Sequence, residues 1–388
     1  DVNSTGVINA ESLYTIEGDL QGLNNLYNST QISGLNNESV ILTDITIVPA
    51  SDAPTFDTSF LNTLDGYTSG LVNTNTVKTI SGLLSDLITS YESAGITNLG
   101  DENIILRDEG TVSATDLTTL ASLNNSGTID AGTIDNINGT ALEIIAVYSD
   151  SKITKPTAVD LTVDSGTVSV DQGRSLNTYT VGTVTGIITS GTTISQMLDG
   201  AVTPTDLVTK GLTVGTGGNA YTITINSSDS SVQASELTSL NSLTTLKVIA
   251  LSVTEITGSI DELNIVYVAG SNNEISNLGD EAVIITDTTV SDVITLNTLN
   301  DYTSGTVNAG SLTTIEGSLS DLLSAYASNG ITGLGNEEIT LADTAVSLTD
   351  LNSLDSYTSG SIDASTVRDI TGDHSYAEVT ALYESSGI

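Results

Sequence analysis

Residues 296–305 read LNTLNDYTSG, and nearly the same ten residues occur at 61–70 (LNTLDGYTSG) and at 351–360 (LNSLDSYTSG). Each copy opens on an apolar anchor, and related anchors recur every 26 to 38 residues along the 388-residue chain. A period of about 30 residues is typical of proteins in which one small structural unit stacks on the next. The anchors are Leu23, Leu61, Leu87, Leu117, Ile144, Leu176, Leu207, Leu237, Leu263, Leu296, Leu322, Leu351 and Val379.

The repeats alternate between two types. In the first type a tyrosine follows the anchor by four residues, at Tyr27, Tyr91, Tyr148, Tyr267, Tyr326 and Tyr383. In the second type the tyrosine follows by six residues, at Tyr67, Tyr302 and Tyr357. A second shared string reads ISGLNNESVILTD at 32–44, ITNLGDENIILRD at 96–108, ISNLGDEAVIITD at 275–287 and ITGLGNEEITLAD at 331–343. Duplication of a two-repeat segment explains this alternation.

Local patterns predict a short capped helix and a strand in each repeat. A hydroxyl residue precedes an acid by three positions before many anchors, which is the spacing of a helix capping box. Behind such a start, Leu322, Ala325 and Tyr326 have the spacing of one buried helical face. The apolar runs 104–106 and 283–286, with 306–309 and 361–364 in the second repeat type, are predicted as strands. The capping pairs are Ser113 with Asp116, Thr140 with Glu143, Thr203 with Asp206, Ser259 with Glu262, Ser318 with Asp321, Ser347 with Asp350 and Ser375 with Glu378.

These patterns predict an α/β repeat fold, a parallel β/α solenoid of about 13 coils, one for each anchor. An all-β solenoid with polar turns is the alternative. Separate globular beads are disfavoured because about 30 residues cannot bury a core alone. The likeness to leucine-rich repeats is one of geometry, since their strict consensus is absent.

The middle of the chain departs from the repeat strings. We expect repeat arms at 1–150 and 236–388, and either divergent β-rich coils or a small β-domain at 151–235. Four of the eight basic residues fall in this middle segment, namely Lys152, Lys155, Arg174 and Lys210.

Composition limits the possible partners. The chain has 48 acidic and 8 basic residues, a net charge of −40, and a positive mean hydropathy of +0.12. Such a charge argues against binding nucleic acid, which requires clustered lysine and arginine. No apolar run approaches the roughly 20 residues of a membrane span, so membrane insertion is not expected. Because the chain has no cysteine, it forms no disulfides.

The strings DLNSLDSYTSGSIDAS (350–365), SDLLSAYASNGITGLGN (320–336) and ITLADTAVSLTDLN (339–352) resemble long, repetitive, acidic surface and secreted proteins of marine bacteria, notably cyanobacteria. The resemblance covers most of the chain except about 150–235. It implies a secreted or cell-surface location and a part in surface layers, adhesion, filaments or motility. It carries no defined activity and no functional residues.

Calcium is the cofactor that the acidic turns suggest. Each Leu-Gly-Asp-Glu type of turn is followed about six residues later by another aspartate, and calcium requires six to eight oxygen ligands. The alternative is that these acids are solvated turn residues and strand-end caps. The candidate ligands are Asp101, Glu102, Asp108, Asp280, Glu281, Asp287, Glu337, Glu338 and Asp343.

Catalysis is not expected from this sequence. His374 is the only histidine, and the neighbouring Ser375 has the position of a helix cap. The recurring tyrosines fit core positions whose hydroxyls reach a polar edge, although glycan binding is an alternative role.

The expected function is therefore non-enzymatic: a structural or assembly protein of a surface layer, filament or tube. Neither end of the sequence shows an obvious polar capping repeat, which favours head-to-tail self-association or a cut from a longer chain. The alternative is an adhesin or fibre-like module that recognises a glycan or a surface protein through the divergent middle.

Overall fold

The computed structural model describes residues 6–49, 57–198 and 211–388. Thr203, Asp206, the anchor Leu207 and Lys210 lie outside these ranges. The contacts divide the chain into two compact units, described separately below. Unit 1 contains 1–187 and 214–220, and unit 2 contains 188–213 and 221–388.

In the described part of unit 1, parallel strands alternate with helices. The helices are α1 (Leu20–Tyr27), α2 (Thr58–Tyr67), α3 (Leu84–Glu92), α4 (Ala114–Leu123), α5 (Ala141–Ser149) and α6 (Val170–Tyr179). The strands are β1 (Ile8–Asn9), β2 (Thr15–Gly18), β3 (Ile32–Ser33), β4 (Ser39–Leu42), β5 (Thr46–Ile47), β6 (Val72–Asn73), β7 (Thr79–Gly82), β8 (Ile96–Thr97), β9 (Asn103–Leu106), β10 (Gly110–Ser113), β11 (Ile129–Asp130), β12 (Ile134–Gly139), β13 (Ile153–Thr154), β14 (Asp160–Val163) and β15 (Val184–Ile187).

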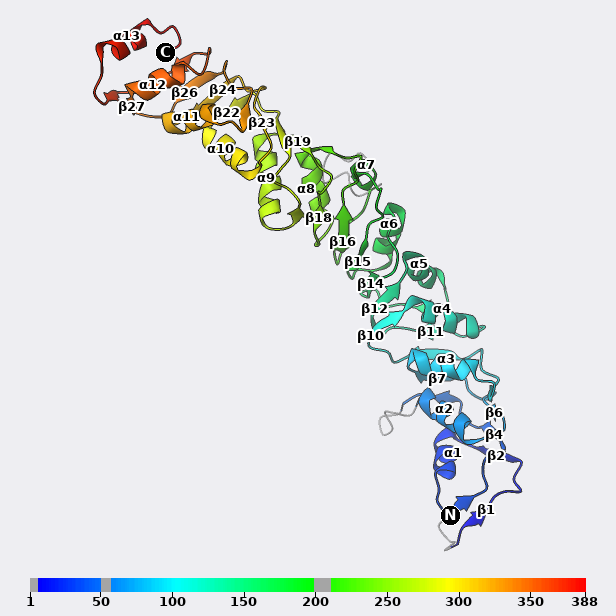
Figure 1. Cartoon of the computed structure of the whole chain (residues 1–388). Helices are drawn as coiled ribbons and strands as arrows, with labels where there is room; N and C mark the ends of the chain where they lie inside the picture. The colour runs from blue at the N-terminus through cyan, green and yellow to red at the C-terminus, as the bar shows by residue number, and fades with distance from the viewer. Residues whose placement is uncertain (1–5, 50–56, 199–210) are drawn as a thin grey trace. The chain divides into compact units, whose positions relative to one another are not determined.

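The strands of unit 1 pair in parallel with strands of neighbouring repeats. Strands β2, β4, β6 and β8 form one sheet in that order, β5, β7, β9, β11 and β13 form a second, and β10, β12, β14 and β15 pair in sequence. The register places like residues side by side, as in Val40 opposite Val72 and Val72 opposite Ile96. Successive helices from α1 to α6 pack against each other in chain order (Figure 1).

Unit 2 repeats this arrangement. Its helices are α7 (Ile194–Leu198), α8 (Ala234–Ser242), α9 (Ile260–Ser271), α10 (Val293–Tyr302), α11 (Leu319–Ala327), α12 (Leu348–Asp355) and α13 (Tyr376–Glu384). The strands from the unit boundary onward are β16 (Asn219–Thr224), β17 (Ser231–Gln233), β18 (Val248–Ile249), β19 (Glu255–Gly258), β20 (Ile275–Ser276), β21 (Ala282–Ile285), β22 (Thr289–Val290), β23 (Val307–Asn308), β24 (Thr314–Gly317), β25 (Ile331–Thr332), β26 (Glu338–Leu341), β27 (Ala345–Ser347), β28 (Ile362–Asp363) and β29 (Asp369–Thr371).

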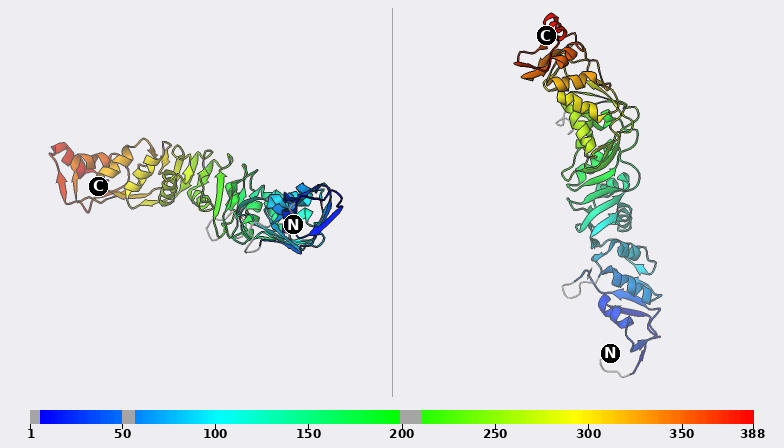
Figure 2. Two further views of the ribbon diagram at one scale, coloured as in Figure 1. Left: turned by 90° about the horizontal axis from the view of Figure 1, so that it is seen from below. Right: turned by 60° about the vertical axis from the view of Figure 1, so that its left-hand side comes forward.

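The strands of unit 2 also pair in parallel from repeat to repeat. The orders are β17-β19-β21-β23-β25, β22-β24-β26-β28, β16-β18-β20 and β27-β29. Helices α7 to α13 pack in chain order, and two further views show the same succession within each unit (Figure 2).

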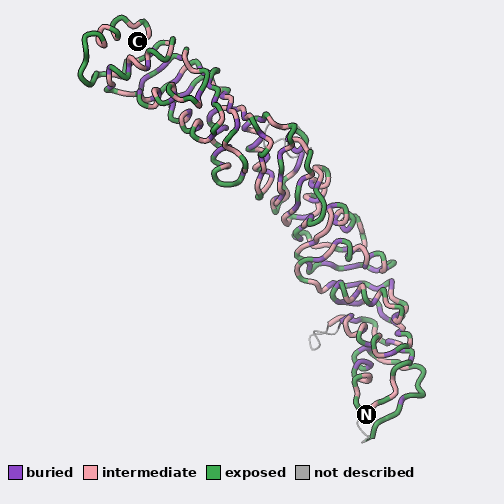
Figure 3. Tube along the Cα trace, viewed as in Figure 1, coloured by how far each residue is buried: buried purple, intermediate pink, exposed green. Residues whose placement is uncertain are grey.

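The core is distributed over all the repeats. Every described anchor except Val379 is buried, and several strands alternate buried and more exposed residues, as Ile104 and Leu106 do with their neighbours in β9. Figure 3 shows buried positions along the whole of each unit instead of at a single centre. Each repeat therefore buries its apolar face against its neighbours, as expected for stacked units.

The helix starts follow the predicted capping pairs. Ser113, Thr140, Ser259, Ser318, Ser347 and Ser375 each accept a hydrogen bond from the backbone N–H three residues on. The reciprocal acid contact is complete at Thr140, Ser259 and Ser375. The hydroxyls thus satisfy helix N–H groups that have no partner within the helix.

The strand content is higher than predicted. The predicted runs correspond to β9, β21, β23 and β28. However, many repeats contain two short strands before the helix instead of one, such as β6 and β7 before α3. A turn closed by the N–H of Val77 and the carbonyl of Thr74 separates this pair. A two-residue strand lacks the alternation that identifies a strand in a sequence.

The α/β character with parallel strands is confirmed. The division at 150 and 235 stays a prediction, because the two compact units follow different boundaries. In the described ranges, no helix combines the length and apolar character needed to cross a membrane.

Candidate functional site: the Tyr–Glu joints

Four glutamates of the second string are fully buried next to a tyrosine of the first repeat type. The tyrosine hydroxyls of Tyr27, Tyr91, Tyr267 and Tyr326 donate to Oε2 of Glu38, Glu102, Glu281 and Glu337 over 3.1, 2.8, 3.2 and 2.7 Å, respectively. All four glutamate side chains have 0% exposure. We call each pair, with the turn that holds it, a Tyr–Glu joint.

The turn before each glutamate supplies further donors. At Glu102, the backbone N–H groups of Gly100 and Asp101 donate to Oε2 over 2.8 and 3.2 Å. Gly100 has a φ of 141°, a conformation that favours glycine. Successive N–H groups pointing into one concavity form an anion-binding nest. Among the described residues, the buried carboxylate of Glu102 is thus held through Oε2 by protein donors, forms no ion pair with a lysine or arginine, and has no hydrogen-bond partner at Oε1.

The YTSG string of the following repeat forms a hydrogen bond with the same glutamate. The hydroxyls of Thr68, Thr303 and Thr358 donate to the main-chain carbonyls of Glu38, Glu281 and Glu337 over 2.7, 2.7 and 3.1 Å. At Glu102, Asn124 replaces the threonine and donates from Nδ2 over 2.9 Å. Each glutamate thus binds its own repeat through the side chain and the next repeat through the main chain.

The glycine of the string is required by close packing. A Cβ on Gly70 would lie 2.2 Å from the carbonyl oxygen of Glu38, and one on Gly305 would lie 2.1 Å from that of Glu281. Gly360 has the same relation to Glu337, at 2.0 Å. No larger residue fits unless the two repeats separate.

The tyrosine of the string stacks on the joint tyrosine. The ring centroids of Tyr27 and Tyr67 are 5.6 Å apart, those of Tyr267 and Tyr302 are 5.5 Å apart, and those of Tyr326 and Tyr357 are 6.0 Å apart. Stacked pairs at such distances add roughly 0.5–1.5 kcal/mol beyond the buried area. The tyrosine, threonine and glycine of YTSG therefore all make contacts between neighbouring repeats.

The last aspartate of the second string caps the preceding helix. Oδ2 of Asp44, Asp108, Asp287 and Asp343 accepts from the N–H of Leu20, Leu84, Ile260 and Leu319 over 2.7, 2.8, 2.7 and 2.6 Å. These N–H groups open α1, α3, α9 and α11. A carboxylate at this position also interacts favourably with the helix dipole.

Burial and the adjacent carboxylate perturb the tyrosines. Burial, followed by the charge of Glu38, raises the pKa of Tyr27 to about 12. Burial, followed by the charge of Glu102 or Glu281, raises the pKa of Tyr91 and Tyr267, respectively, and burial followed by the hydrogen bond to Glu337 raises that of Tyr326. The hydroxyls therefore remain protonated donors at neutral pH.

The structure does not gather the predicted calcium ligands into one place. Glu102, Glu281 and Glu337 lie in the buried joints, whereas Asp108, Asp287 and Asp343 cap helices. Asp101, Asp280 and Glu338 are exposed. Among the described residues, no three His, Asp or Glu side chains form a group that could hold a metal ion. The calcium hypothesis continues to rest on the sequence.

The three described basic residues of the middle segment, Lys152, Lys155 and Arg174, make contacts within the chain. Nζ of Lys152 donates to the carbonyls of Ala121 and Asn124, and Nζ of Lys155 donates to that of Asp150 over 2.7 Å. Cations at helix C-termini stabilise the final carbonyls. Arg174 pairs with Asp171. An exposed basic binding patch would require these charges, but here they are engaged in contacts within the chain.

The serine beside the only histidine serves as a helix cap. Ser375 Oγ accepts from the N–H of Glu378 over 3.2 Å, and Glu378 Oε2 accepts from the Ser375 N–H over 2.8 Å. The ring of the exposed His374 lies 3.4 Å from the carbonyl oxygen of Ile370. Ser375 thus has the capping role predicted from its spacing.

The Tyr–Glu pairing was missed at the level of sequence. A spacing of eleven residues at three of the four joints, as from Tyr91 to Glu102 and from Tyr326 to Glu337, was the available signal. From Tyr267 to Glu281 the spacing is fourteen residues. Comparison with protein-family models, curated proteins and solved structures found no match to this chain.

Proposed function

We propose that this chain is a non-enzymatic structural repeat protein, a parallel β/α solenoid of about 13 coils that forms a segment or subunit of a surface layer, filament or tube. One observation carries this proposal. The residues that recur from copy to copy are used in contacts between neighbouring repeats, as at Glu337, which binds Tyr326 of its own repeat and Thr358 of the next.

An enzyme or a receptor concentrates its distinctive residues around one pocket. Here the distinctive strings instead form a series of equivalent joints. A protein with this design can carry mechanical load along its repeats and keep them at a fixed spacing. Each repeat is held to the next by main-chain hydrogen bonds between strands, buried polar contacts and stacked tyrosine rings. The resemblance to acidic surface proteins and the charge of −40 support a secreted or cell-surface location.

The proposed assembly requires that copies of the chain associate with each other. Helix α13 has no buried residue, and its Tyr376 and Tyr383 are 88% and 86% exposed. Next to it lies a hollow of about 360 Å³ whose lining includes Leu351, Val367 and Ile370. These apolar groups offer a surface on which a repeat of another copy packs head-to-tail.

Negative-stain electron microscopy of the purified protein tests assembly. The proposal predicts filaments, tubes or sheets that lengthen with protein concentration. Monodisperse particles at every concentration, with and without millimolar calcium, would contradict assembly. A hydrolytic or transferase activity that survives purification to homogeneity would contradict the non-enzymatic part.

A further inference from the structure

One repeat of unit 2 is longer than its counterparts. Tyr267 precedes Ile275 by eight residues, whereas Tyr91 precedes Ile96 by five and Tyr326 precedes Ile331 by five. The three extra residues extend α9 to Ser271, giving it twelve residues where α3 and α11 have nine. After the helix, Asn273 adopts a φ of 64°.

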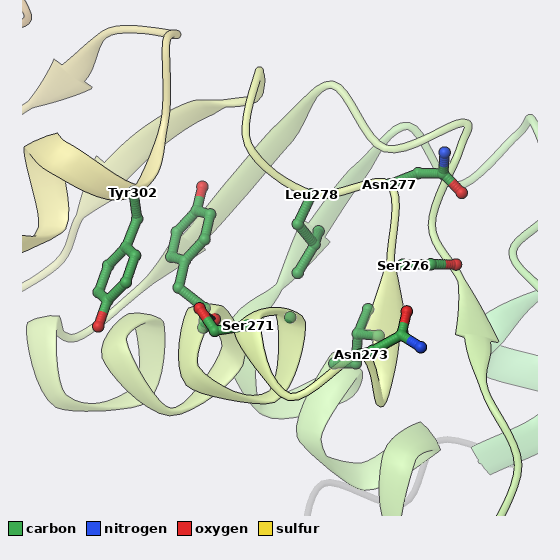
Figure 4. Close-up of a pocket in the computed structure, with 9 residues that line it drawn as sticks. Ser271, Asn273, Ser276, Asn277, Leu278 and Tyr302 are labelled. Atoms are coloured by element: carbon green, nitrogen blue, oxygen red, sulfur yellow. Dashed lines mark hydrogen bonds between the residues drawn. The ribbon is translucent and has the colours of Figure 1, made fainter.

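The insertion creates two adjacent hollows. The first, of about 270 Å³, is lined by Tyr302, Ser271, Leu278 and Asn277 among others. The second, of about 420 Å³, shares Asn273 with it and is lined by residues including Asn241, Lys247 and Glu274. Figure 4 shows Tyr302 and Ser271 on one side of Leu278, and Asn273, Ser276 and Asn277 on the other side. The side chains of Ser276 and Asn277 point the same way, away from Tyr302 (Figure 4).

A second difference between the copies concerns the side-chain amide of Asn277, which lines the first hollow. In the matching turn of unit 1, Asn98 has a φ of 68° and donates from Nδ2 to Oδ1 of Asn73 over 2.9 Å. Asn277 has nearly the same φ, 64°, but Ile249 occupies the place of Asn73 in the adjacent strand. The Asn277 amide consequently makes no hydrogen bond with any side chain or backbone group in the described ranges, and it is exposed.

We propose that the first hollow binds a neutral glycan. The lining contains amides, hydroxyls and tyrosine rings and has no charged side chain. An amide both donates and accepts, which matches sugar hydroxyls that do the same. The volume is close to the lower end of the roughly 300–1,000 Å³ found for small-molecule sites. The charge of −40 disfavours acidic sugars and phosphates.

This inference does not depend on the structural role proposed above. A glycan site in one repeat would attach the repeat array to a polysaccharide, whether or not the array assembles with further copies. The place differs from the divergent middle segment that the sequence suggested for binding.

Isothermal titration calorimetry with three neutral probes (maltotriose, cellotriose and triacetylchitotriose) tests the site on the full chain. The N277G variant keeps the backbone, because Gly333 occupies the same position in another copy with a φ of 87°. The matched control is N98G, which removes the equivalent amide outside the hollow.

We expect at least one probe to bind, and N277G to weaken that binding about tenfold, the effect of losing one or two hydrogen bonds. We expect N98G to bind like the unmodified chain and a trigalacturonate probe to bind more weakly. Absence of binding by all three neutral probes would overturn the proposal. Equal binding by N277G and N98G, or tighter binding of trigalacturonate, would also overturn it. Matching thermal melts of the two variants establish that both remain folded.

Discussion

The hydroxyl of Tyr326 donates to Oε2 of Glu337 over 2.7 Å, and the same pair of residue types meets at three other joints. The glutamate is fully buried and forms no ion pair with a described basic residue. Burying a carboxylate is costly unless hydrogen bonds replace its lost water. At Glu337 the backbone N–H groups of Gly335 and Asn336 also donate to Oε2, whereas Oε1 has no hydrogen-bond partner among the described residues.

Removal of this carboxylate should destabilise unit 2. In E337A the Tyr326 hydroxyl and two N–H groups lose their acceptor, and we expect a loss of at least about 2 kcal/mol in the free energy of unfolding. Urea denaturation measures the change. The adjacent E338A is the control, since Glu338 is exposed and its removal should change stability by less than about 0.5 kcal/mol. Equal effects of the two variants would contradict the role given to the joint.

Alkaline pH should unfold the chain. Because the pKa of Tyr27 is about 12 in the folded state and that of a free tyrosine is about 10, the unfolded chain loses its tyrosine protons first. The raised pKa values of Tyr91, Tyr267 and Tyr326 act in the same direction. Stability is therefore complete below about pH 10 and is lost as the pH rises further.

Ultraviolet absorbance of tyrosinate, followed together with circular dichroism, tests this expectation. A late fraction of the 13 tyrosines should ionise together with loss of helix signal, and Y326F should reduce that fraction. Ionisation of all tyrosines in one step while the helices remain folded would disagree with the buried hydroxyl bonds.

The sequence predicted the elements better than the joints. Helix starts such as Ser259 and Ser375 were predictable because a capping box depends on residues three positions apart. The pairing of Glu281 with Tyr267 depends on which way a turn residue faces, and a turn has no periodicity that reveals this. The acidic turn was consequently interpreted as a possible metal site, although Glu281 points into the interior.

The hollow beside α9 likewise depends on contacts that local sequence patterns do not reveal. The three additional residues before Ile275 are visible in the sequence when the copies are aligned. That Ile249 pairs with Ser276, and so takes the place of Asn73 next to the turn of Asn277, follows only from the strand register, which joins residues of different repeats. Contacts between residues far apart in the chain decide where a polar group lacks a partner.

Mild acidification should remove the unfavourable burial and charge repulsion of the ionised Asp86 side chain. Burial, followed by the charges of Asp57 and Asp108, raises the pKa of Asp86. A raised folded-state pKa means that stability is lost as the pH rises through it and recovered as the pH falls. We expect D86N to make thermal stability less dependent on pH between neutral pH and about pH 4.

Asp116 provides the control for this variant. It occupies the first turn of α4 as Asp86 does in α3, so D116N also removes a first-turn acid. Thermal melts across the pH range compare the two variants. A pH dependence that D86N and D116N alter equally would contradict the specific repulsion at Asp86.

Calcium should stabilise the chain if the acidic turns bind it. The hypothesis predicts that calcium raises the melting temperature more than magnesium does at the same ionic strength, and that EDTA reverses the rise. Calorimetry measures both effects. Equal effects of the two cations would indicate only screening of the −40 charge and would contradict a calcium site.

Two glycines of one string provide the sharpest test of the joints. Gly66 and Gly70 both belong to LNTLDGYTSG at 61–70. A Cβ on Gly66 would meet nothing within 4 Å, whereas one on Gly70 would lie 2.2 Å from the carbonyl oxygen of Glu38. Gly66 lies within α2, where alanine is favoured over glycine by up to about 1 kcal/mol.

The decisive measurement is urea unfolding of G66A and G70A beside the unmodified chain. If the recurring strings hold neighbouring repeats together, G70A loses about 1–3 kcal/mol through forced separation at the joint, while G66A is unchanged or more stable. If G70A is as stable as G66A, the YTSG string is not the contact between repeats described here, and the structural role proposed for the chain loses its main support.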